Sequence, residues 1–186
     1  MTEAGVLLYG GPAAGKDTVT SALEDSDPRF QLFRRLKAGS GRTAGYRMTT
    51  TDEVGQLRSA NAVLWENERY SSLYVIDRPE LDRLLAANQI PVLHFGQEQA
   101  VESVRQAAPA VRWTVVELWC PRAVATARIE ARETGDTAAR LQAWNETGHL
   151  SHPDLFIDTS LVSAASAAER IRQKVISWAF PSSSLH

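Results

Sequence analysis

The sequence predicts an α/β fold in which helices flank a mainly parallel sheet. Strand-like and helix-like segments alternate along the chain, an order that produces parallel strands joined by helices. A glycine-rich stretch joins the first apolar segment, Val6–Tyr9, to the first helical one. The chain has 186 residues, of which 44% are hydrophobic, which is enough for one domain with a proper core. We therefore expect a single domain over residues 1–186, with room for a small insertion or lid.

The elements are predicted in order from apolar runs, capping residues and turn residues. Apolar or β-branched runs predict the strands Val6–Tyr9, Phe30–Leu36, Tyr46–Thr49, Tyr74–Ile76, Ile90–Phe95, Trp113–Trp119 and Leu155–Ile157. Helical patterns predict a helix that starts near Val19, and then helices at Thr51–Asn61, Pro79–Ala87, Glu98–Gln106, Arg122–Arg132, Thr137–Trp144 and Ala164–Trp178. Thr51 is expected to cap its helix, with two acidic residues in the first turn, and Pro79 to lie in a first turn. The glycine-rich segment Lys37–Gly45 is expected to be a flexible loop.

The most specific motif follows the first predicted strand. It has the pattern G-x-x-x-x-G-K, and the expected phosphate-binding residues are Gly10, Gly11, Ala13, Ala14, Gly15, Lys16, Asp17 and Thr18. A strand, a glycine-rich loop and a helix in this order form a P-loop, in which backbone N–H groups and the helix N-terminus face phosphate oxygens. Lys16 would reach the β- and γ-phosphates as a mobile charge. The alternative is an ordinary turn with a solvated lysine.

A departure from the motif concerns the residue after Lys16. This position is usually Ser or Thr, but here it is Asp17, and Thr18 follows one residue later. Asp17 is expected to hold Mg²⁺ through water, with Thr18 as the second metal candidate. The alternative for Asp17 is a plain acidic residue at a helix N-terminus.

Composition excludes several classes of function. The net charge of −2 gives no overall basic field, so neither nucleic acid nor an anionic membrane is an expected partner. The single cysteine, Cys120, excludes an internal disulfide and a cysteine-based metal set, and it is expected to be buried. His149 and His152 lack a third ligand at metal spacing and are expected to be structural or exposed. Without a signal peptide or a long apolar span, the expected location is cytoplasmic.

Together these segments resemble the guanylate kinase-like P-loop kinases, which include nucleoside monophosphate kinases, and the related ribose 1,5-bisphosphate phosphokinases. The P-loop ending in Gly-Lys-Asp-Thr is more similar to the second group. The segment 33–37 lies where these families have a strand ending in acceptor-phosphate-binding residues, and Arg128–Arg132, followed by Arg140, resembles their lid. The resemblance implies an acceptor-binding insertion at about residues 37–74 and a lid at about residues 128–148. His94 stands near the site that it implies, although a packed core histidine is the commoner explanation.

The chain also departs from the guanylate kinase pattern. The Thr-Thr-Arg acceptor motif is absent, and Ser71 replaces a glycine. Glu66 is a loose match to the acid that reads guanine. The predicted strand Ile90–Phe95 has no aspartate at its end, so no Walker-B acid is visible. These departures count against guanine as the acceptor base and affect the prediction of ATP binding much less.

The resemblance implies roles for two sets of residues. Lid arginines would neutralise charge on the transferring phosphoryl group, so the catalytic candidates besides Lys16 are Arg128, Arg132 and Arg140. Acceptor binding is assigned to Lys37, Arg42, Tyr46, Glu66, Tyr70 and Ser71. For the arginines the alternative is a solvated helix face with neighbouring glutamates, for the two cations a solvated loop, and for the tyrosines a place in the core.

The expected function is transfer of the γ-phosphoryl group of ATP, with Mg²⁺, to a small phosphorylated acceptor. The first candidate acceptor is a nucleoside monophosphate or an analogue. A sugar-phosphate kinase of the ribose 1,5-bisphosphate type is the second candidate. A nucleotide-binding regulatory module without catalysis is the third, and the missing Walker-B acid favours it.

Overall fold

The computed structural model describes residues 3–41, 43–69, 71–132 and 135–179 and has an α/β fold. Its central sheet has five strands in the order β2-β7-β1-β8-β9, and every neighbouring pair is parallel. The bounds of these strands are β1 Ala4–Tyr9, β2 Phe30–Leu32, β7 Ile90–Phe95, β8 Arg112–Trp119 and β9 Leu155–Asp158. The predicted fold class, with a mainly parallel sheet flanked by helices, is confirmed.

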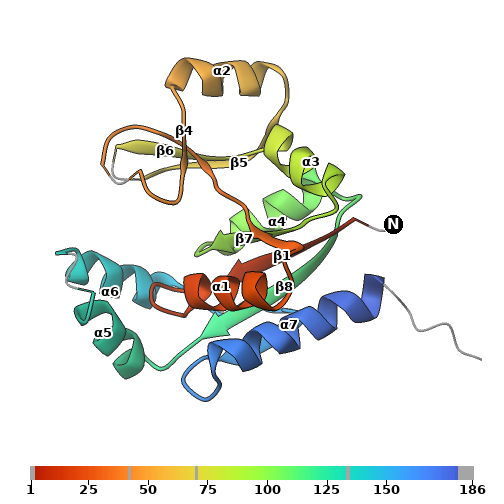
Figure 1. Cartoon of the computed structure of the whole chain (residues 1–186). Helices are drawn as coiled ribbons and strands as arrows, with labels where there is room; N and C mark the ends of the chain where they lie inside the picture. The colour runs from red at the N-terminus through yellow and green to blue at the C-terminus, as the bar shows by residue number, and fades with distance from the viewer. Residues whose placement is uncertain (1–2, 42, 70, 133–134, 180–186) are drawn as a thin grey trace, which may run out of the picture.

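Helices cover both faces of this sheet (Figure 1). The helices on the two faces are α1 Lys16–Ser26, α3 Arg78–Ala86, α4 Glu98–Ala107 and α7 Ala164–Ala179. Alternate residues of β1 enter two separate cores, because successive side chains of a strand point to opposite faces. Val6 and Leu8 pack with α1 and α7, whereas Leu7 packs with α3 and α4. Every residue of β1 is buried, as expected for the middle strand of a parallel sheet.

A second sheet forms an upper lobe above the main body (Figure 1). Its strand order is β4-β3-β6-β5, and helix α2 Thr51–Ser59 covers it. The strands are β3 Leu36–Ala38, β4 Arg47–Met48, β5 Val63–Arg69 and β6 Ser72–Asp77. The cap of α2 is Thr50 rather than the predicted Thr51: its hydroxyl accepts from the Glu53 backbone N–H, while the Glu53 carboxylate accepts from the Thr50 N–H.

The upper lobe differs from the sequence prediction in two places. The predicted strand Phe30–Leu36 is in fact two strands, because the chain leaves the main sheet after Leu32 and enters the second sheet at Leu36. β3 therefore includes Lys37, which was predicted to lie on a flexible loop but is 2% exposed. β5 was not predicted.

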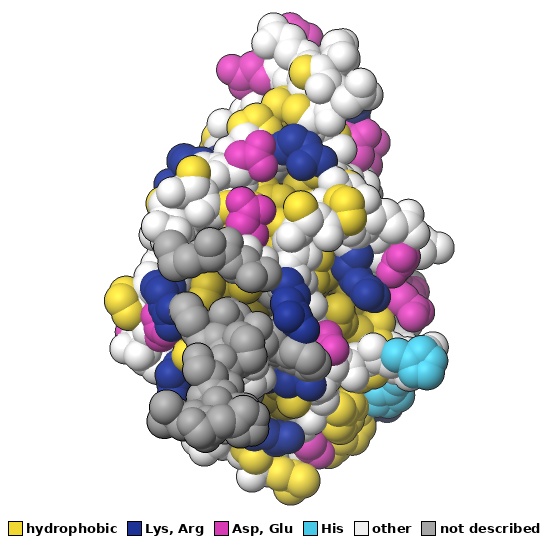
Figure 2. Space-filling model, turned by 90° about the vertical axis from the view of Figure 1, so that its right-hand side faces the viewer, with side chains coloured by type: hydrophobic (Ala, Val, Ile, Leu, Met, Phe, Trp, Pro, Cys, Tyr) yellow, Lys and Arg dark blue, Asp and Glu magenta, His cyan; other side chains and the backbone are white. Residues whose placement is uncertain are grey.

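Two further helices, α5 Arg122–Glu130 and α6 Thr137–Glu146, follow β8 and lie beside the amino-terminal end of α1 (Figure 1). α5 ends two residues before the predicted end, so Arg132 lies beyond the helix. In the space-filling view, acidic and basic side chains are mixed over the visible face, above which the upper lobe rises (Figure 2). Among the described residues, no helix is both long and apolar enough to cross a membrane.

Candidate functional site

The candidate site lies at the carboxyl ends of the central strands, where the glycine-rich loop 10–15 joins β1 to α1. Two glycines make the path of this loop possible. A Cβ on Gly10 would lie 2.3 Å from the backbone oxygen of Leu118, so no side chain fits there. Gly15, which precedes α1, has a φ of 98°, a left-handed conformation that glycine adopts without strain. The two glycines therefore allow the N-terminus of α1 to lie at the carboxyl ends of the central strands.

Lys16 is held against the loop by its own backbone. Its Nζ donates hydrogen bonds to the carbonyl oxygens of Gly10 and, at 3.0 Å, of Gly11. Its pKa is lowered from 10.5 to about 8, chiefly by burial and to a smaller extent by the nearby cations Arg35 and Arg132. The ammonium group has a carboxylate neighbour in Asp17, which opposes this shift without cancelling it. Lys16 is therefore a cation in surroundings that favour the arrival of an anion.

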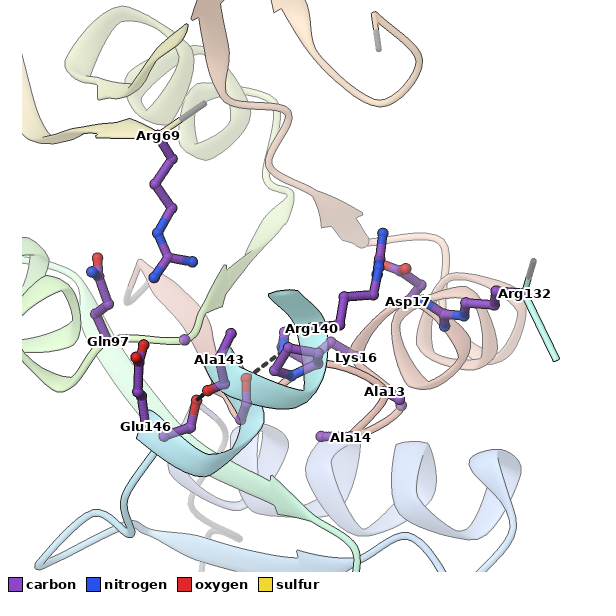
Figure 3. A pocket seen from close by; sticks show the side chains of 15 residues that line it. Ala13, Ala14, Lys16, Asp17, Arg69, Gln97, Arg132, Arg140, Ala143 and Glu146 are labelled. Atoms are coloured by element: carbon purple, nitrogen blue, oxygen red, sulfur yellow. Dashed lines mark hydrogen bonds between the residues drawn. The ribbon is translucent and has the colours of Figure 1, made fainter. Parts of the chain in front are cut away.

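The loop cavity, about 360 Å³ in volume, opens beside Lys16. Side chains from three parts of the chain converge on it (Figure 3). Arg69 reaches toward it from β5, while Arg132 and Arg140 come from the α5–α6 segment. Its other lining residues are Gly10, Pro12, Ala13, Ala14, Gly15, Lys16, Asp17, Gly96, Gln97, Ala143, Glu146 and Thr147. Most of the predicted phosphate-binding residues and two of the three predicted arginines therefore share one cavity.

Arg128, the third predicted arginine, does not line the loop cavity. It donates hydrogen bonds to the Ala13 carbonyl at 3.0 Å and to the hydroxyl and carbonyl of Thr159 at 3.0 and 2.8 Å. These contacts join α5 to the glycine-rich loop and to the end of β9. Arg128 instead lines a separate Arg128 cavity of about 430 Å³, whose walls include Thr18, Arg132, Thr159, Val162 and Ala164.

The two predicted metal candidates are divided between these cavities. Asp17 lines the loop cavity, whereas Thr18 lines the Arg128 cavity. Asp17 is next to His94, with its Oδ1 3.4 Å from Nδ1, and this interaction lowers the pKa of Asp17 to about 2. Within the described part of the chain, no group of three or more histidine, cysteine, aspartate or glutamate residues is placed to hold a metal ion. The acidic residues that line the loop cavity are Asp17 and Glu146.

A third space, the aromatic cavity of about 220 Å³, adjoins the loop cavity and shares Arg69, Gly96 and Gln97 with it. Its other lining residues are Arg35, Tyr46, Trp65, Asn67, Tyr74, Phe95 and Ala100. The guanidinium of Arg35 lies 5.3 Å from the ring centres of both Trp65 and Phe95. Burial lowers its pKa to about 10. Among the described residues it has no ion-pair partner, so it faces the cavity as an uncompensated cation.

Asn67 is a second unsatisfied group in the aromatic cavity. Its Oδ1 is buried and accepts no hydrogen bond from the described residues. A buried acceptor without a partner costs about 1–3 kcal/mol, so such atoms commonly await a ligand or water. Trp65, Asn67 and Arg69 are every second residue of β5, so they share one face of the strand. All three line this cavity.

Glu66 lies on the opposite face of β5, which corrects its predicted position. Its carboxylate forms an ion pair with Arg58 of α2 at 3.0 Å, away from the aromatic cavity. Adjacent residues of a strand point to opposite faces, so Glu66 faces away from the cavity that its neighbour Asn67 lines.

The remaining predicted acceptor residues divide into three groups. Tyr46 lines the aromatic cavity, and its role in acceptor binding stays a prediction. Lys37 is buried and donates to the Ser40 carbonyl at 2.6 Å, and Ser71 is exposed at a turn and lines none of the cavities described above. Arg42 and Tyr70 lie outside the described residues. Sequence reasoning missed Arg35, Asn67 and Arg69 as individual site residues, although the strand alternation in Trp65-Glu66-Asn67-Glu68-Arg69 was a usable signal.

His149, predicted to be structural or exposed, is largely exposed and also contacts a buried residue of the central sheet. Its ring is 63% exposed, yet its Nδ1 contacts Oε1 of the buried Glu117 in β8 at 2.5 Å. The other oxygen of Glu117 accepts from the Leu150 N–H at 2.9 Å, and the Tyr9 hydroxyl donates to the Gly148 carbonyl at 2.8 Å. These bonds fix the chain just after α6 to the central sheet. Cys120 is buried, as predicted.

Comparison with known proteins agrees with this arrangement at the level of the fold. No family model and no curated protein sequence matches the chain. A solved guanylate kinase from Anaplasma phagocytophilum superimposes with a TM-score of 0.60 at 13% identity, over 95% of this chain and 86% of that one. The structure titled APE1195 superimposes with a TM-score of 0.57 at 16% identity, over 94% of this chain and 96% of that one. The chain therefore has a guanylate kinase-like fold.

Proposed function

We propose that the protein is an ATP-dependent phosphotransferase that moves the γ-phosphoryl group to a small phosphorylated acceptor. The observation that carries the proposal is the junction of two cationic cavities. The loop cavity contains Lys16 and the glycine-rich backbone, the aromatic cavity contains Arg35, and the two share Arg69. Phosphoryl transfer needs two anionic reactants side by side, and this junction offers a place for each.

The donor would occupy the loop cavity. Backbone N–H groups of the glycine-rich loop and the N-terminus of α1 would face its phosphates, and Lys16 would exchange its carbonyl partners for phosphate oxygens. The Arg128 cavity, with Val162 and Ala164 in its wall, provides an adjoining apolar space for the base of the nucleotide. Asp17 is an ionised carboxylate in the loop cavity, which fits a hydrated Mg²⁺ ion that would neutralise phosphate charge.

The α5–α6 segment, about residues 128–148, would act as the lid. Arg132 and Arg140 line the loop cavity from this segment and would place guanidinium groups on the charge of the transferring phosphoryl group. Arg128 has a different part, since its bonds to Ala13 and Thr159 brace the base of the segment. No protein nucleophile is needed, because the acceptor's own phosphate oxygen attacks.

The acceptor would bind in the aromatic cavity with its phosphate on Arg35. The residues at about 37–74 would then form the acceptor-binding insertion, as the resemblance implies. Asn67 Oδ1 would accept a hydrogen bond from a hydroxyl or N–H group of the acceptor. A nucleoside monophosphate or an analogue is the first candidate.

A sugar phosphate with a second anionic group, of the ribose 1,5-bisphosphate type, is the second candidate. It is favoured by the charge of the aromatic cavity: the described lining residues include two arginines and no carboxylate. Glu66, the candidate for reading guanine, is on the other face of β5.

Release of ADP during steady-state turnover tests the proposal directly. Purified protein is given ATP and Mg²⁺ with a panel of nucleoside monophosphates, sugar phosphates and the corresponding unphosphorylated compounds. Turnover restricted to phosphorylated acceptors supports the proposal, and the best acceptor decides between the two candidates. An uncharged best acceptor contradicts the role of Arg35, and ATP binding without any turnover favours a regulatory module.

A further inference from the structure

A histidine near the carboxyl end of β7 contacts an acidic residue in the first turn of α1. His94 Nδ1 lies 3.4 Å from Asp17 Oδ1. On its other side, Nε2 lies 2.7 Å from the hydroxyl oxygen of Thr20. The three side chains form a short chain that runs from the interior of the protein to the loop cavity.

The directions of these hydrogen bonds follow from the chemistry of the three groups. A carboxylate only accepts hydrogen bonds, so the ring nitrogen that faces Asp17, Nδ1 of His94, is the one that carries the proton. With the proton on Nδ1, Nε2 of the neutral imidazole has a free lone pair, and this nitrogen faces the Thr20 hydroxyl. The Thr20 hydroxyl then donates to Nε2. Thr20 thus fixes the tautomer of His94, much as outer partners orient the histidines of metal sites.

Exposure changes sharply along this chain. Thr20 is 2% exposed as a residue, the His94 side chain is 17% exposed, and the Asp17 side chain is 78% exposed. Asp17 lines the loop cavity and also an inter-lobe cavity of about 540 Å³, which it shares with Lys16, Arg35 and His94. A largely buried pair therefore contacts an exposed carboxylate that faces both the loop cavity and the inter-lobe cavity.

We propose that His94 is a positioning residue that holds the Asp17 carboxylate for the hydrated metal ion of the bound nucleotide, with Thr20 fixing the required tautomer. Asp17, in the first turn of α1, would thereby face the metal ion from the start of the helix. This inference rests on the proposed function. It involves no proton transfer, since Asp17 acts only as an ionised acceptor of hydrogen bonds.

The test measures metal affinity rather than activity. Binding of Mn²⁺ to the protein–ADP complex is followed by electron paramagnetic resonance of the free ion, and binding of ADP alone is measured in EDTA. Asp17→Asn is expected to weaken Mn²⁺ binding about tenfold, and His94→Gln by a similar factor, at the lower end of outer-partner effects at metal sites. The double variant should bind Mn²⁺ within about twofold of Asp17→Asn, because His94 acts only through Asp17.

Thr20 supplies a matched pair of variants. Thr20→Val is nearly isosteric and removes the hydroxyl, so it should weaken Mn²⁺ binding several-fold. Thr20→Ser keeps the hydroxyl and should restore the affinity. The His94 and Thr20 variants should bind ADP in EDTA within about twofold of the wild type. This pair keeps the test decisive even if His94→Gln does not fold.

Three results overturn the inference. If His94 acts only through Asp17, His94→Gln has no full effect of its own in the Asp17→Asn protein. Additive losses of Mn²⁺ affinity in the double variant therefore refute the inference. Equal Mn²⁺ affinity of Thr20→Val and Thr20→Ser also refutes it, as does a loss confined to thermal stability. If the wild-type protein shows no nucleotide-dependent Mn²⁺ binding at all, the metal-assisted mechanism of the proposed function fails as well. If the wild type binds Mn²⁺ in this way but the variants do not behave as stated, only the role of His94 fails.

Discussion

Replacing Lys16 with methionine is expected to stabilise the ligand-free protein while abolishing phosphoryl transfer. Burial is the main reason that the pKa of Lys16 falls from 10.5 to about 8. At about 1.4 kcal/mol per pKa unit, the charged lysine costs the folded state about 3 kcal/mol at neutral pH. Methionine keeps the length of the side chain and loses the bonds to the Gly10 and Gly11 carbonyls, worth about 1 kcal/mol each. A net gain of about 1 kcal/mol follows.

The sign of the pH dependence makes this prediction specific. Because the folded pKa is the lower one, the cost is fully present below about pH 8 and disappears as pH rises toward 10.5, where the unfolded lysine is neutral too. The advantage of Lys16→Met should therefore be largest at pH 7 and shrink at pH 10. Urea unfolding at both values measures it, and Lys16→Arg, which keeps a cation, is the control without a gain. A variant that is less stable than wild type at pH 7, or whose advantage ignores pH, refutes the reasoning.

Three further predictions concern the arginines. Arg35→Gln should raise the acceptor KM at least tenfold and leave the ATP KM nearly unchanged, while Glu66→Gln, on the other face of β5, should change neither; steady-state kinetics that show the reverse pattern contradict the assignment of the aromatic cavity. Arg132→Ala should lower kcat far more than ATP affinity, because its contact strengthens in the transition state, and equal losses count against a lid role. Arg128→Ala should lower the free energy of unfolding by about 2 kcal/mol, since three hydrogen bonds from a charged donor are lost, and unchanged urea unfolding would exclude a bracing role.

The glycine-rich loop could be predicted from the sequence because all its determinants are local. The strand before it, the glycines and Lys16 lie within a few residues, and their conformations depend on each other more than on distant parts of the chain. The helices were also predicted closely, since caps and periodicity are local signals. The structure places Lys16 and Asp17 on one cavity.

The acceptor side was harder to predict because it depends on strand register. Glu66 and Asn67 are adjacent, yet β5 turns one toward Arg58 and the other into the aromatic cavity. Lys37 was predicted on a loop because glycines follow it, but pairing with β6 draws it into a strand. The segment Phe30–Leu36 is apolar enough to be one strand, and only the tertiary arrangement divides it between two sheets. Long-range pairing decides each of these positions.

The same long-range arrangement separates Arg128 from Arg132. Four residues apart, they would share one face of a continuous helix. α5 ends at Glu130, however, and Arg128 is bonded to Ala13 and Thr159, which lie 115 and 31 residues away in the chain. The helix end thus assigns one arginine to the framework and leaves the other at the loop cavity. The sequence around Arg128 does not indicate that Ala13 and Thr159 lie next to it, so this difference between the two arginines could only be found in the structure.

Lys16 and Arg35 show why two anions fit this molecule better than one. Each has a pKa lowered chiefly by burial, and Arg35 is among the groups that lower the pKa of Lys16. A single anion in the loop cavity would neutralise Lys16 and leave Arg35 without a counter-charge among the described residues. A second anion in the aromatic cavity removes that remaining cost. The burial of these two cations therefore supports the proposal of two anionic reactants, one in each cavity.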